Sequence, residues 1–359
     1  MARPSLNIGL LSAPCVAPPS QTHDGTQMIV AQLARGLVAA GQSVTVFPTG
    51  DCPVPGSTAH GVSSATDEPL GGGFVDLQHV MAGHEALAGC DVVHDHTLLG
   101  PAWALASNRR TVLTTCHGPL TGELRSVYGR YAARLPVVAT SHEHVARAPE
   151  IAFSRVIHDC LDLDRFPMGR GAGGYLLFLG RLAPANGVRE AVLLSRAVGR
   201  PLVIAAKMRA PAEYTYFDEE ARPLLGDDVM FVGEAVDGAK LDLLAGATAL
   251  LNPIHRPEPF GLAMTEALAC GTPVVTCSVG AATEIVEHGV TGFICDDRTE
   301  LVDALAHVGD LDRTACRAAV AERFSTERMV AEYLSLYELM VNSDSERLQV
   351  GPDALGACP

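Results

Sequence analysis

Short apolar segments alternate with longer segments of helical periodicity along the first half of the chain. The strand-like segments are LNIGLLS, SVTVF, DVVHDH, TVLTTCH and LPVVATS, and several of them end in polar residues. After the first segment, Ile29, Leu33 and Leu37 recur at every fourth position, which predicts a helix that Gly41 ends. This alternation indicates a parallel sheet covered by helices.

The second half repeats the pattern after a glycine-rich segment, MGRGAGG at residues 168–174, which is typical of an interdomain linker. A last helix is expected to begin near Ser325, with Met329, Tyr333 and Tyr337 on one stripe. The strand-like segments of this half are GGYLLFLGRL, PLVIAAK, DVMFVGEA, TALLNPI, PVVTCSV and GFICDD.

The predicted fold class is therefore α/β, with two doubly wound Rossmann-like domains that face a central cleft. We expect an N-terminal domain over residues 1–167, a C-terminal domain over 168–324, a helix over 325–342 that packs back toward the N-terminal domain, and a mobile tail over 343–359. In open α/β sheets, ligands collect outside the carboxyl ends of the strands, so the cleft is the expected ligand site.

The segment PEPFGLAMTEALACGTPVV places two acids around the start of a predicted helix. Glu258 precedes the helix and Glu266 lies two turns into it. The free backbone N–H groups near Phe260, Gly261 and Leu262 can bind phosphate or sugar oxygens. Two hydroxyl acceptors beside an anion site suit a sugar nucleotide. The alternative is that one acid complements the helix dipole and the other is a solvated helix residue, which two isolated glutamates would favour.

The spacing of these glutamates resembles that of the retaining glycosyltransferases of family 4, which have the GT-B fold. Other segments resemble the family's landmarks in the same order: LLSAP, DGTQMIVAQLARGLVAAGQSVTVF, DVVHDH, TTCHGP, GRLAPANG, FVGE and GAATEIVEHGVTGF. The resemblance covers roughly residues 6–342. It implies transfer of a sugar from a nucleoside-diphosphate sugar, bound by the C-terminal domain, to an acceptor on the N-terminal domain.

Carried onto matching positions, the resemblance implies a set of donor contacts in the C-terminal domain. Glu266 would bind the ribose hydroxyls, and Glu258 would hold hydroxyls of the donor sugar. For Arg181, the alternative is a surface ion pair. The other expected contacts are the backbone at Phe260 and Gly261 to the sugar, the Leu262 N–H and the Arg181 guanidinium to the diphosphate, and the backbone at Val232 and Gly233 to the base.

In the N-terminal domain, the resemblance implies that His117 contacts the donor sugar near the reacting carbon, although a lone histidine at a strand end is more often structural. His117, Arg181 and Glu258 are the expected catalytic residues. Gly25 and Thr26 open the first long helix, whose N-terminus can approach the diphosphate.

The segment HDH at residues 94–96 superficially suggests metal ligands. Alternation along a strand puts His94 and His96 on one face, but no carboxylate or cysteine cluster accompanies them. An acceptor-pocket role or a packing role is therefore expected, and no metal or cofactor.

Two departures from the family pattern concern charge. The family usually has a lysine at the position of Asn186, so the diphosphate is either less neutralised or held by Lys207, Arg189 or Arg209 instead. On this basis Asn186→Lys is expected to tighten nucleotide binding. Asp24 stands where relatives commonly have a glycine, adds an anion near the phosphates and bears on the acceptor.

The expected mechanism is front-face displacement, in which the leaving diphosphate takes the acceptor's proton and the protein stabilises the developing charge. Two alternatives are a GT-B nucleotide-sugar epimerase or phosphorylase, and a sugar-nucleotide binder without catalysis. A dinucleotide oxidoreductase is disfavoured because neither domain begins with G-x-G-x-x-G after its first strand.

Composition and net charge limit the classes of partner that the chain is expected to bind. The chain has 359 residues and a net charge of −15, which argues against nucleic acid or an anionic membrane as a main partner. Its ten cysteines form no CxxC pair, and its first segment is strand-like and not typical of a signal peptide. We expect a cytoplasmic monomer or homodimer without membrane insertion. The expected ligands are a UDP-sugar or GDP-sugar donor and a soluble small-molecule or natural-product acceptor.

Overall fold

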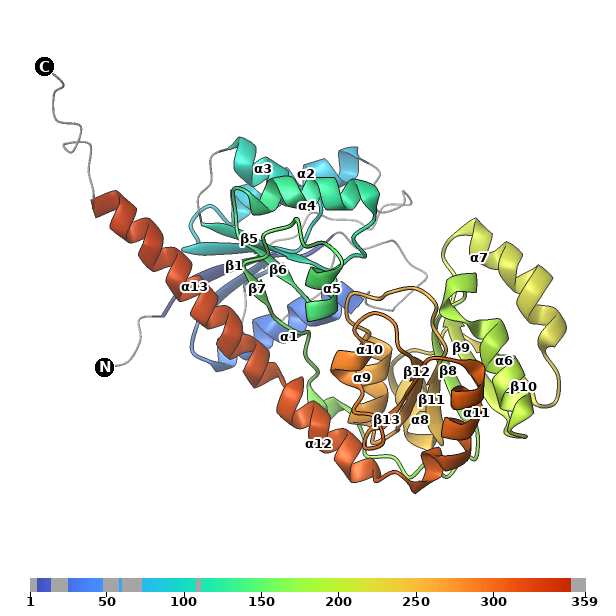
Figure 1. Cartoon of the computed structure of the whole chain (residues 1–359). Helices are drawn as coiled ribbons and strands as arrows, with labels where there is room; N and C mark the ends of the chain where they lie inside the picture. The colour runs from blue at the N-terminus through green and yellow to red at the C-terminus, as the bar shows by residue number, and fades with distance from the viewer. Residues whose placement is uncertain (1–4, 14–24, 48–57, 60–72, 108–110, 350–359) are drawn as a thin grey trace, which may run out of the picture. The chain divides into compact units, whose positions relative to one another are not determined.

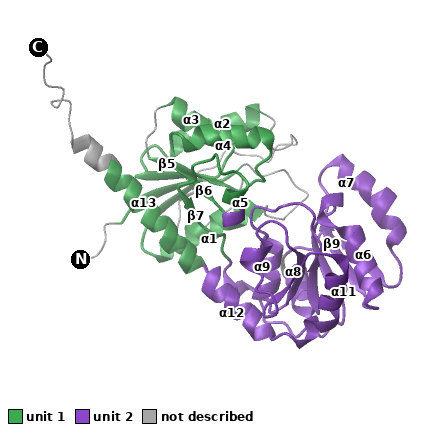
Figure 2. Ribbon diagram, viewed as in Figure 1, with its two compact units in different colours: residues 1–140, 145–160, 326–359 green, residues 141–144, 161–325 purple. Residues whose placement is uncertain are grey.

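The computed structural model describes residues 5–13, 25–47, 58–59, 73–107 and 111–349. The chain divides into two compact units (Figure 2). Unit 1 contains residues 1–140, 145–160 and 326–359, and unit 2 contains residues 141–144 and 161–325. The chain therefore enters unit 2 after Cys160, earlier than the expected boundary at residue 167, and the last helix belongs to unit 1.

Unit 1 is built on a parallel seven-stranded sheet in the order β3-β2-β1-β4-β5-β6-β7. Strand order reverses between β1 and β4, which is where doubly wound sheets bind ligands. The five predicted strands of this half are confirmed, whereas β3 and β7 were not predicted. The strands are β1 (Asn7–Leu11), β2 (Ser43–Phe47), β3 (Thr58–Ala59), β4 (Val92–Asp95), β5 (Val112–Cys116), β6 (Val137–Ala139) and β7 (Arg155–Val156).

Helices cover both faces of this sheet, with α2, α3 and α4 on one face and α1 and α13 on the other (Figure 1). Gly36 of α1 lets α13 approach closely, since a Cβ atom there would lie 2.5 Å from Cγ2 of Val330. The helices are α1 (Gly25–Ala39), α2 (Phe74–Ala86), α3 (Gly100–Ala106), α4 (Gly122–Ala132), α5 (His142–Ala146) and α13 (Thr326–Gln349).

The expected end of the last helix was wrong. α13 continues to Gln349, past the predicted end at residue 342, so the first part of the expected mobile tail is helical. The rest of that tail, residues 350–359, lies outside the described residues.

Unit 2 is built on a parallel six-stranded sheet in the order β10-β9-β8-β11-β12-β13, and all six predicted strands are confirmed. Its strand order reverses between β8 and β11, where a ligand is again expected. The strands are β8 (Leu176–Arg181), β9 (Leu202–Lys207), β10 (Val229–Gly233), β11 (Ala249–Asn252), β12 (Val274–Cys277) and β13 (Gly292–Cys295).

In unit 2, α6 and α11 pack on one face of the sheet and α9, flanked by α8 and α12, on the other. The core between the sheet and α6 and α11 includes Phe178, Ile204, Leu251 and Val275. The helices are α6 (Val188–Ala197), α7 (Pro211–Tyr216), α8 (Asp237–Gly246), α9 (Leu262–Ala269), α10 (Ala282–Ile285), α11 (Arg298–His307) and α12 (Arg313–Arg323). Shorter turns of helix cover Leu163–Arg165, Pro184–Asn186, Phe217–Ala221, Arg222–Leu224 and Val308–Asp310.

The glycine-rich segment at residues 168–174 is not an interdomain linker but a packed part of unit 2. The Gly169 N–H donates to the Cys270 carbonyl at 2.9 Å, and the Gly173 N–H donates to the Gly246 carbonyl at 2.9 Å. A Cβ atom on Gly169 would lie 2.2 Å from the Ala245 carbonyl oxygen, so this position needs glycine for close backbone approach.

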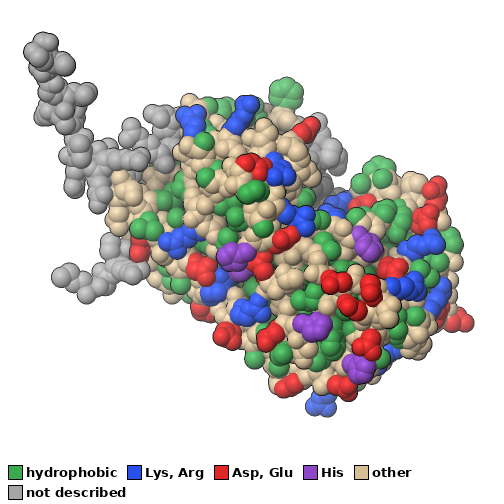
Figure 3. All heavy atoms as spheres, in the orientation of Figure 1, with side chains coloured by type: hydrophobic (Ala, Val, Ile, Leu, Met, Phe, Trp, Pro, Cys, Tyr) green, Lys and Arg blue, Asp and Glu red, His purple; other side chains and the backbone are tan. Residues whose placement is uncertain are grey.

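Charged side chains of both signs are interspersed over the face drawn in Figure 3. Among the helices of the described residues, none is both long and apolar enough to cross a membrane.

Candidate functional site

The loop before α9 is shaped by two residues of the Pro-Phe-Gly sequence. Phe260 is buried and packs edge-to-face on Phe324, with ring centroids 5.6 Å apart, so its side chain anchors the loop. Gly261 has φ 119, and a Cβ atom there would lie 2.5 Å from Cε of Met264. α9 begins at Leu262, and its first N–H groups have no carbonyl partner within the helix. Backbone donors are therefore presented at this end of α9, as the sequence predicts.

Glu258 stands in this loop next to a cation that the sequence analysis did not single out. Its Oε1 lies 3.4 Å from Nη2 of Arg256. Burial raises the pKa of the Glu258 carboxyl, and the charge of Arg256 opposes that rise. A Cβ atom on Gly280 would lie 2.6 Å from the Glu258 nitrogen, so the loop that begins α10 lies directly against this residue. Glu258 therefore lies between Arg256 and the loop that contains Gly280.

Glu266 is buried on α9 and forms an ion pair with Lys240 of α8. Lys240 Nζ donates to Oε1 of Glu266 at 2.7 Å. Glu266 is 5% exposed, so the alternative of a solvated helix acid is wrong. The lysine keeps a negative charge tolerable in this buried position.

Arg181, at the carboxyl end of β8, forms an ion pair with Glu213 of α7 at 2.5 Å between Nη2 and Oε1. The other carboxylate oxygen of Glu213 accepts hydrogen bonds from the backbone N–H groups of Arg209 at 2.6 Å and Ala210 at 3.0 Å. Burial alone would raise the pKa of Glu213, but these bonds and the charge of Arg181 lower it. The ion pair that was the alternative for Arg181 is therefore present, and it fixes a side chain that remains 45% exposed.

Asn186 is buried, and its side-chain amide makes two hydrogen bonds. Its Nδ2 donates to the Arg181 carbonyl at 3.1 Å, and its Oδ1 accepts from Nε of Arg256 at 2.9 Å. Asn186 therefore links the end of β8 to the loop that carries Glu258.

The three cations suggested as substitutes for the missing lysine differ in their position relative to Arg181. Arg189 pairs with Glu220 at 3.1 Å, and Arg209 pairs with Glu234 at 2.8 Å. Lys207 ends β9 directly beside Arg181 in the sheet register. Of the three, only Lys207 adjoins Arg181 in the sheet.

Val232 and Gly233 lie at the carboxyl end of the edge strand β10. Phe231 pairs with Ile204 and Gly233 with Ala205, so the register skips Val232, whose side chain is exposed. Gly233 has φ 75. The strand end is therefore irregular at Val232, and its contact with a base stays a prediction.

In unit 1, His94 of β4 is a buried member of a hydrogen-bonded chain. Its Nδ1 bonds with the Tyr337 hydroxyl at 2.8 Å and its Nε2 with Oγ1 of Thr115 at 2.8 Å, and Thr115 bonds in turn with the Tyr333 hydroxyl at 2.8 Å. Burial, together with the nearby His117, holds the pKa of His94 well below its usual value. Of the two expected roles, these contacts favour packing, because they attach α13 to the sheet.

His96 and His117 lie together at the ends of β4 and β5. His96 Nδ1 and His117 Nε2 are 2.9 Å apart, and the rings stack with centroids 5.2 Å apart. Burial holds the pKa of His96 well below its usual value, so the ring is neutral. His96 Nε2 is buried and has no hydrogen-bond partner among the residues the structure describes.

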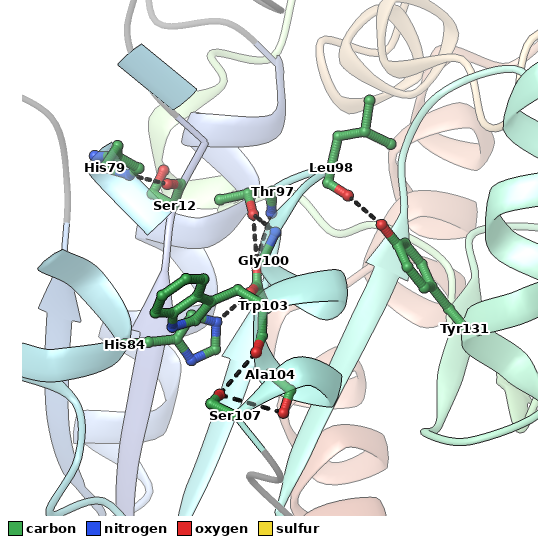
Figure 4. Close-up of polar contacts among 11 residues, drawn as sticks. Ser12, His79, His84, Thr97, Leu98, Gly100, Trp103, Ala104, Ser107 and Tyr131 are labelled. Carbon is green, nitrogen blue, oxygen red and sulfur yellow. Dashed lines mark hydrogen bonds and ion pairs between the residues drawn. The ribbon is translucent and has the colours of Figure 1, made fainter. Parts of the chain in front are cut away.

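Asp95, which lies between His94 and His96 at the end of β4, points to the opposite face of the sheet and stabilises the loop after β4. Asp95 accepts from the Thr97 backbone N–H at 2.8 Å and bonds with Nε2 of His84 at 2.9 Å. A Cβ atom on Gly100 would lie 1.7 Å from Oδ2 of Asp95. Figure 4 shows the contacts around this loop, including the Tyr131 hydroxyl donating to the Leu98 carbonyl at 2.9 Å.

The remaining expected positions in unit 1 are at the start of α1. Gly25 and Thr26 form the first turn of that helix, while Asp24 lies outside the described residues. Within the described ranges, no group of three or more His, Cys, Asp or Glu side chains could hold a metal ion.

Comparison with known proteins matches residues 169–319 to the family described as glycosyl transferases group 1. The N-acetyl-alpha-D-glucosaminyl L-malate synthase of Bacillus anthracis is 32% identical over 126 residues, which cover 33% of this chain and 32% of that enzyme. The D-inositol 3-phosphate glycosyltransferase of Arthrobacter sp. is 26% identical over 96% of this chain and 97% of its own. The chain thus spans about a third of the first relative and almost all of the second.

Solved structures share the two-unit architecture. Sucrose-phosphate synthase from Thermosynechococcus elongatus has a TM-score of 0.78 at 21% identity, over 94% of this chain and 100% of that one. AviGT4, a glycosyltransferase involved in avilamycin A biosynthesis, has a TM-score of 0.70 at 25% identity, over 94% and 98%. Anabaena HepE, solved in complex with UDP and glucose, has a TM-score of 0.72 at 19% identity, over 92% and 99%.

Residues 169–319 thus match the group 1 glycosyltransferases, which is the resemblance expected of the GT4 type, and the chain has the GT-B fold. The resemblance to family 4 and the predicted fold class are therefore confirmed. The expected donor contacts of unit 2 lie within the matched segment, whereas Gly25, Thr26, His94, His96 and His117 lie outside it.

Three residues at the candidate site of the glycosyltransferase were missed from the sequence. Lys240, Glu213 and Arg256 each pair with a residue that was expected to bind the donor. Arg256 stands two positions before Glu258, so its proximity in sequence was an available signal. Lys240 and Glu213 lie in helices of mixed composition, where nothing distinguishes them from solvated charges.

Proposed function

We propose that this glycosyltransferase moves a sugar from a nucleoside-diphosphate sugar, of the UDP or GDP type, to a hydroxyl or other nucleophile of a small soluble molecule, with retention at the anomeric carbon. The observation that carries the proposal is the arrangement at α9, where Glu258 and Glu266 flank a helix start that presents backbone N–H groups. Such a site offers donors for a diphosphate and acceptors for sugar hydroxyls.

The ion pairs explain how acids can serve at an anion site. Lys240 offsets the charge of Glu266, and Arg256 offsets that of Glu258. An ionised carboxylate accepts hydrogen bonds only, which suits the recognition of ribose and hexose hydroxyls. Their negative charge is therefore locally balanced and does not repel the diphosphate as an unpaired acid would.

Arg181 is oriented for the leaving group by Glu213, which holds one edge of its guanidinium. Because that geometry exists before the ligand binds, little reorganisation is needed when charge develops on the diphosphate. The glycosidic bond from the anomeric carbon to the phosphate oxygen breaks, and the acceptor oxygen bonds to that carbon from the same face. The acceptor's proton passes to the departing phosphate oxygen, so no metal or cofactor enters the balance.

His117 would contact the donor sugar near the reacting carbon. His96 Nδ1 bonds with Nε2 of His117 at 2.9 Å, which fixes the orientation of the His117 ring. His117, Arg181 and Glu258 remain the proposed catalytic residues.

The acceptor class rests on the relatives. AviGT4 is involved in avilamycin A biosynthesis, and the Arthrobacter relative is a D-inositol 3-phosphate glycosyltransferase. A soluble polyol or natural-product acceptor is consistent with both.

The test is thermal stabilisation of the purified protein by UDP-, GDP-, ADP- and dTDP-sugars. We expect one nucleotide class to raise the unfolding midpoint, and both Glu266→Ala and Arg181→Ala to abolish that rise. Arg222→Ala is the matched control, because Arg222 pairs with Asp218 on the exposed surface at 2.5 Å. No rise with any donor would contradict the proposal. Once a donor is found, formation of a glycoside distinguishes transfer from epimerisation, phosphorolysis or binding alone.

A further inference from the structure

Arg256 occupies a central position at the candidate donor site. Its Nε donates to Oδ1 of Asn186 at 2.9 Å, and its Nη2 lies 3.4 Å from Oε1 of Glu258. It therefore bridges the proposed sugar-binding acid and the residue that stands where the family has a lysine. These bonds use two of the five N–H donors of the guanidinium among the described residues.

Asn186 is uncharged and cannot replace the family's lysine as a cation, but its side chain can position a neighbouring cation. Its side chain is 6% exposed, and both ends of its amide are bonded, to the Arg181 carbonyl and to Arg256. Because the amide is fixed at both ends, the guanidinium of Arg256 is held close to the backbone of Arg181. The chain thus brings a second cation to this point from the loop before α9.

Other cations are less suited to this role. Arg189 is directed to Glu220 in a largely exposed pair, and Arg209 is directed to Glu234 in a partly exposed one. Lys207 adjoins Arg181 in the sheet, whereas Arg256 is bonded directly to Asn186.

We propose that Arg256 supplies the second positive charge for the leaving diphosphate, in the role that a lysine at position 186 has in the family, with Asn186 as its positioning residue. The inference rests on the proposed function. An arginine can bind two phosphate oxygens through its planar fork, whereas a lysine offers a point charge. Partial exposure, 38% for the Arg256 side chain, leaves the guanidinium accessible to a ligand.

The experiment measures dissociation constants for the nucleoside diphosphate, the nucleoside monophosphate and the nucleoside of the base that the donor screen selects. We expect Arg256→Gln to weaken diphosphate binding about tenfold and monophosphate binding less, because a charge-assisted contact is lost. It should also reduce the salt dependence of diphosphate binding, a change that a purely structural role would not produce. Arg222→Gln, on the exposed surface, is the control and should bind as the wild type does.

The reciprocal variant makes the test specific. The double variant Asn186→Lys/Arg256→Gln has its cation at position 186, where the family has a lysine. Its affinity for the diphosphate should recover toward the wild-type value. Wild-type affinity and salt dependence in Arg256→Gln would overturn the inference, and loss in Lys207→Gln alone would assign the role to Lys207. If Arg256→Gln is poorly folded, Arg256→Lys, which keeps the charge, should retain the salt dependence. Failure of the wild type to bind any nucleotide would instead contradict the proposed function.

Discussion

Lys240 Nζ lies 2.7 Å from Oε1 of Glu266, so the acid expected to bind ribose hydroxyls is already paired before any ligand arrives. Glu266 is 5% exposed, whereas the side chain of Lys240 is 26% exposed. Lys240 therefore offers an opposite charge to Glu266 in a place where a lone carboxylate would be unfavourable. Lys240 is a positioning residue for Glu266.

Lys240→Met should destabilise the protein by about 1–3 kcal/mol, because it leaves the buried carboxylate of Glu266 without its cation. Urea unfolding measures the change. The double variant Lys240→Met/Glu266→Gln removes the uncompensated charge and should regain part of the loss. Equal stability of the wild type and Lys240→Met would show that the ion pair contributes nothing.

Tyr337→Phe should destabilise the protein by about 1–2 kcal/mol, since it leaves Nδ1 of the buried His94 without its hydroxyl partner. The matched control is Tyr214→Phe, because Tyr214 is 51% exposed and its hydroxyl bonds only a carbonyl, at 3.3 Å. Chemical unfolding of both variants should separate them. A loss of the same size in Tyr214→Phe would mean that the buried chain of hydrogen bonds adds no stability of its own.

The strands were predictable because their signal is local. A run such as YLLFLG is apolar along its whole length, and the alternation of such runs with helical segments specifies parallel pairing with helices on both faces. The helix that carries Glu266 was predictable for the same reason, but it begins at Leu262, so Glu266 lies about one turn into it and not two. Local patterns therefore gave the fold class and the position of the candidate site.

The pairings within the site could not be predicted in the same way. Asn186 and Arg256 are 70 residues apart, and Lys240 and Glu266 are 26 apart, so only the folded sheet brings them together. The prediction that the glycine-rich segment at residues 168–174 is an interdomain linker was wrong for a different reason. Glycine suits both a flexible linker and close backbone approach, and composition does not separate the two.

Asp159→Asn should stabilise the protein increasingly as pH rises from about 4 to about 7. Burial raises the pKa of the Asp159 carboxyl to about 7 from 3.8, with Arg328 opposing the rise. Between these values the folded chain keeps a proton that the unfolded chain releases, so the wild type loses stability with rising pH at up to about 1.4 kcal/mol per unit. Asparagine resembles the protonated acid and does not titrate.

The measurement is the free energy of unfolding of both proteins at several pH values. Their difference should be small near pH 4 and greatest at pH 7 and above. A difference that stays constant with pH would mean that Arg328 holds Asp159 ionised in the folded state, and would remove burial as the dominant influence on this carboxyl.

Gly280→Ala should weaken donor binding, whereas Gly289→Ala should not. Both glycines have positive φ, 63 and 78, so either substitution introduces backbone strain of about 1 kcal/mol. They differ in the space around them. A Cβ atom on Gly280 would lie 2.6 Å from the Glu258 nitrogen, while one on Gly289 would meet nothing within 4 Å. Only Gly280→Ala should therefore displace Glu258, and its donor affinity should fall severalfold, with a greater loss of thermal stability than in Gly289→Ala. Equal affinities in the two variants would show that the exact placement of the Glu258 backbone does not matter for the donor.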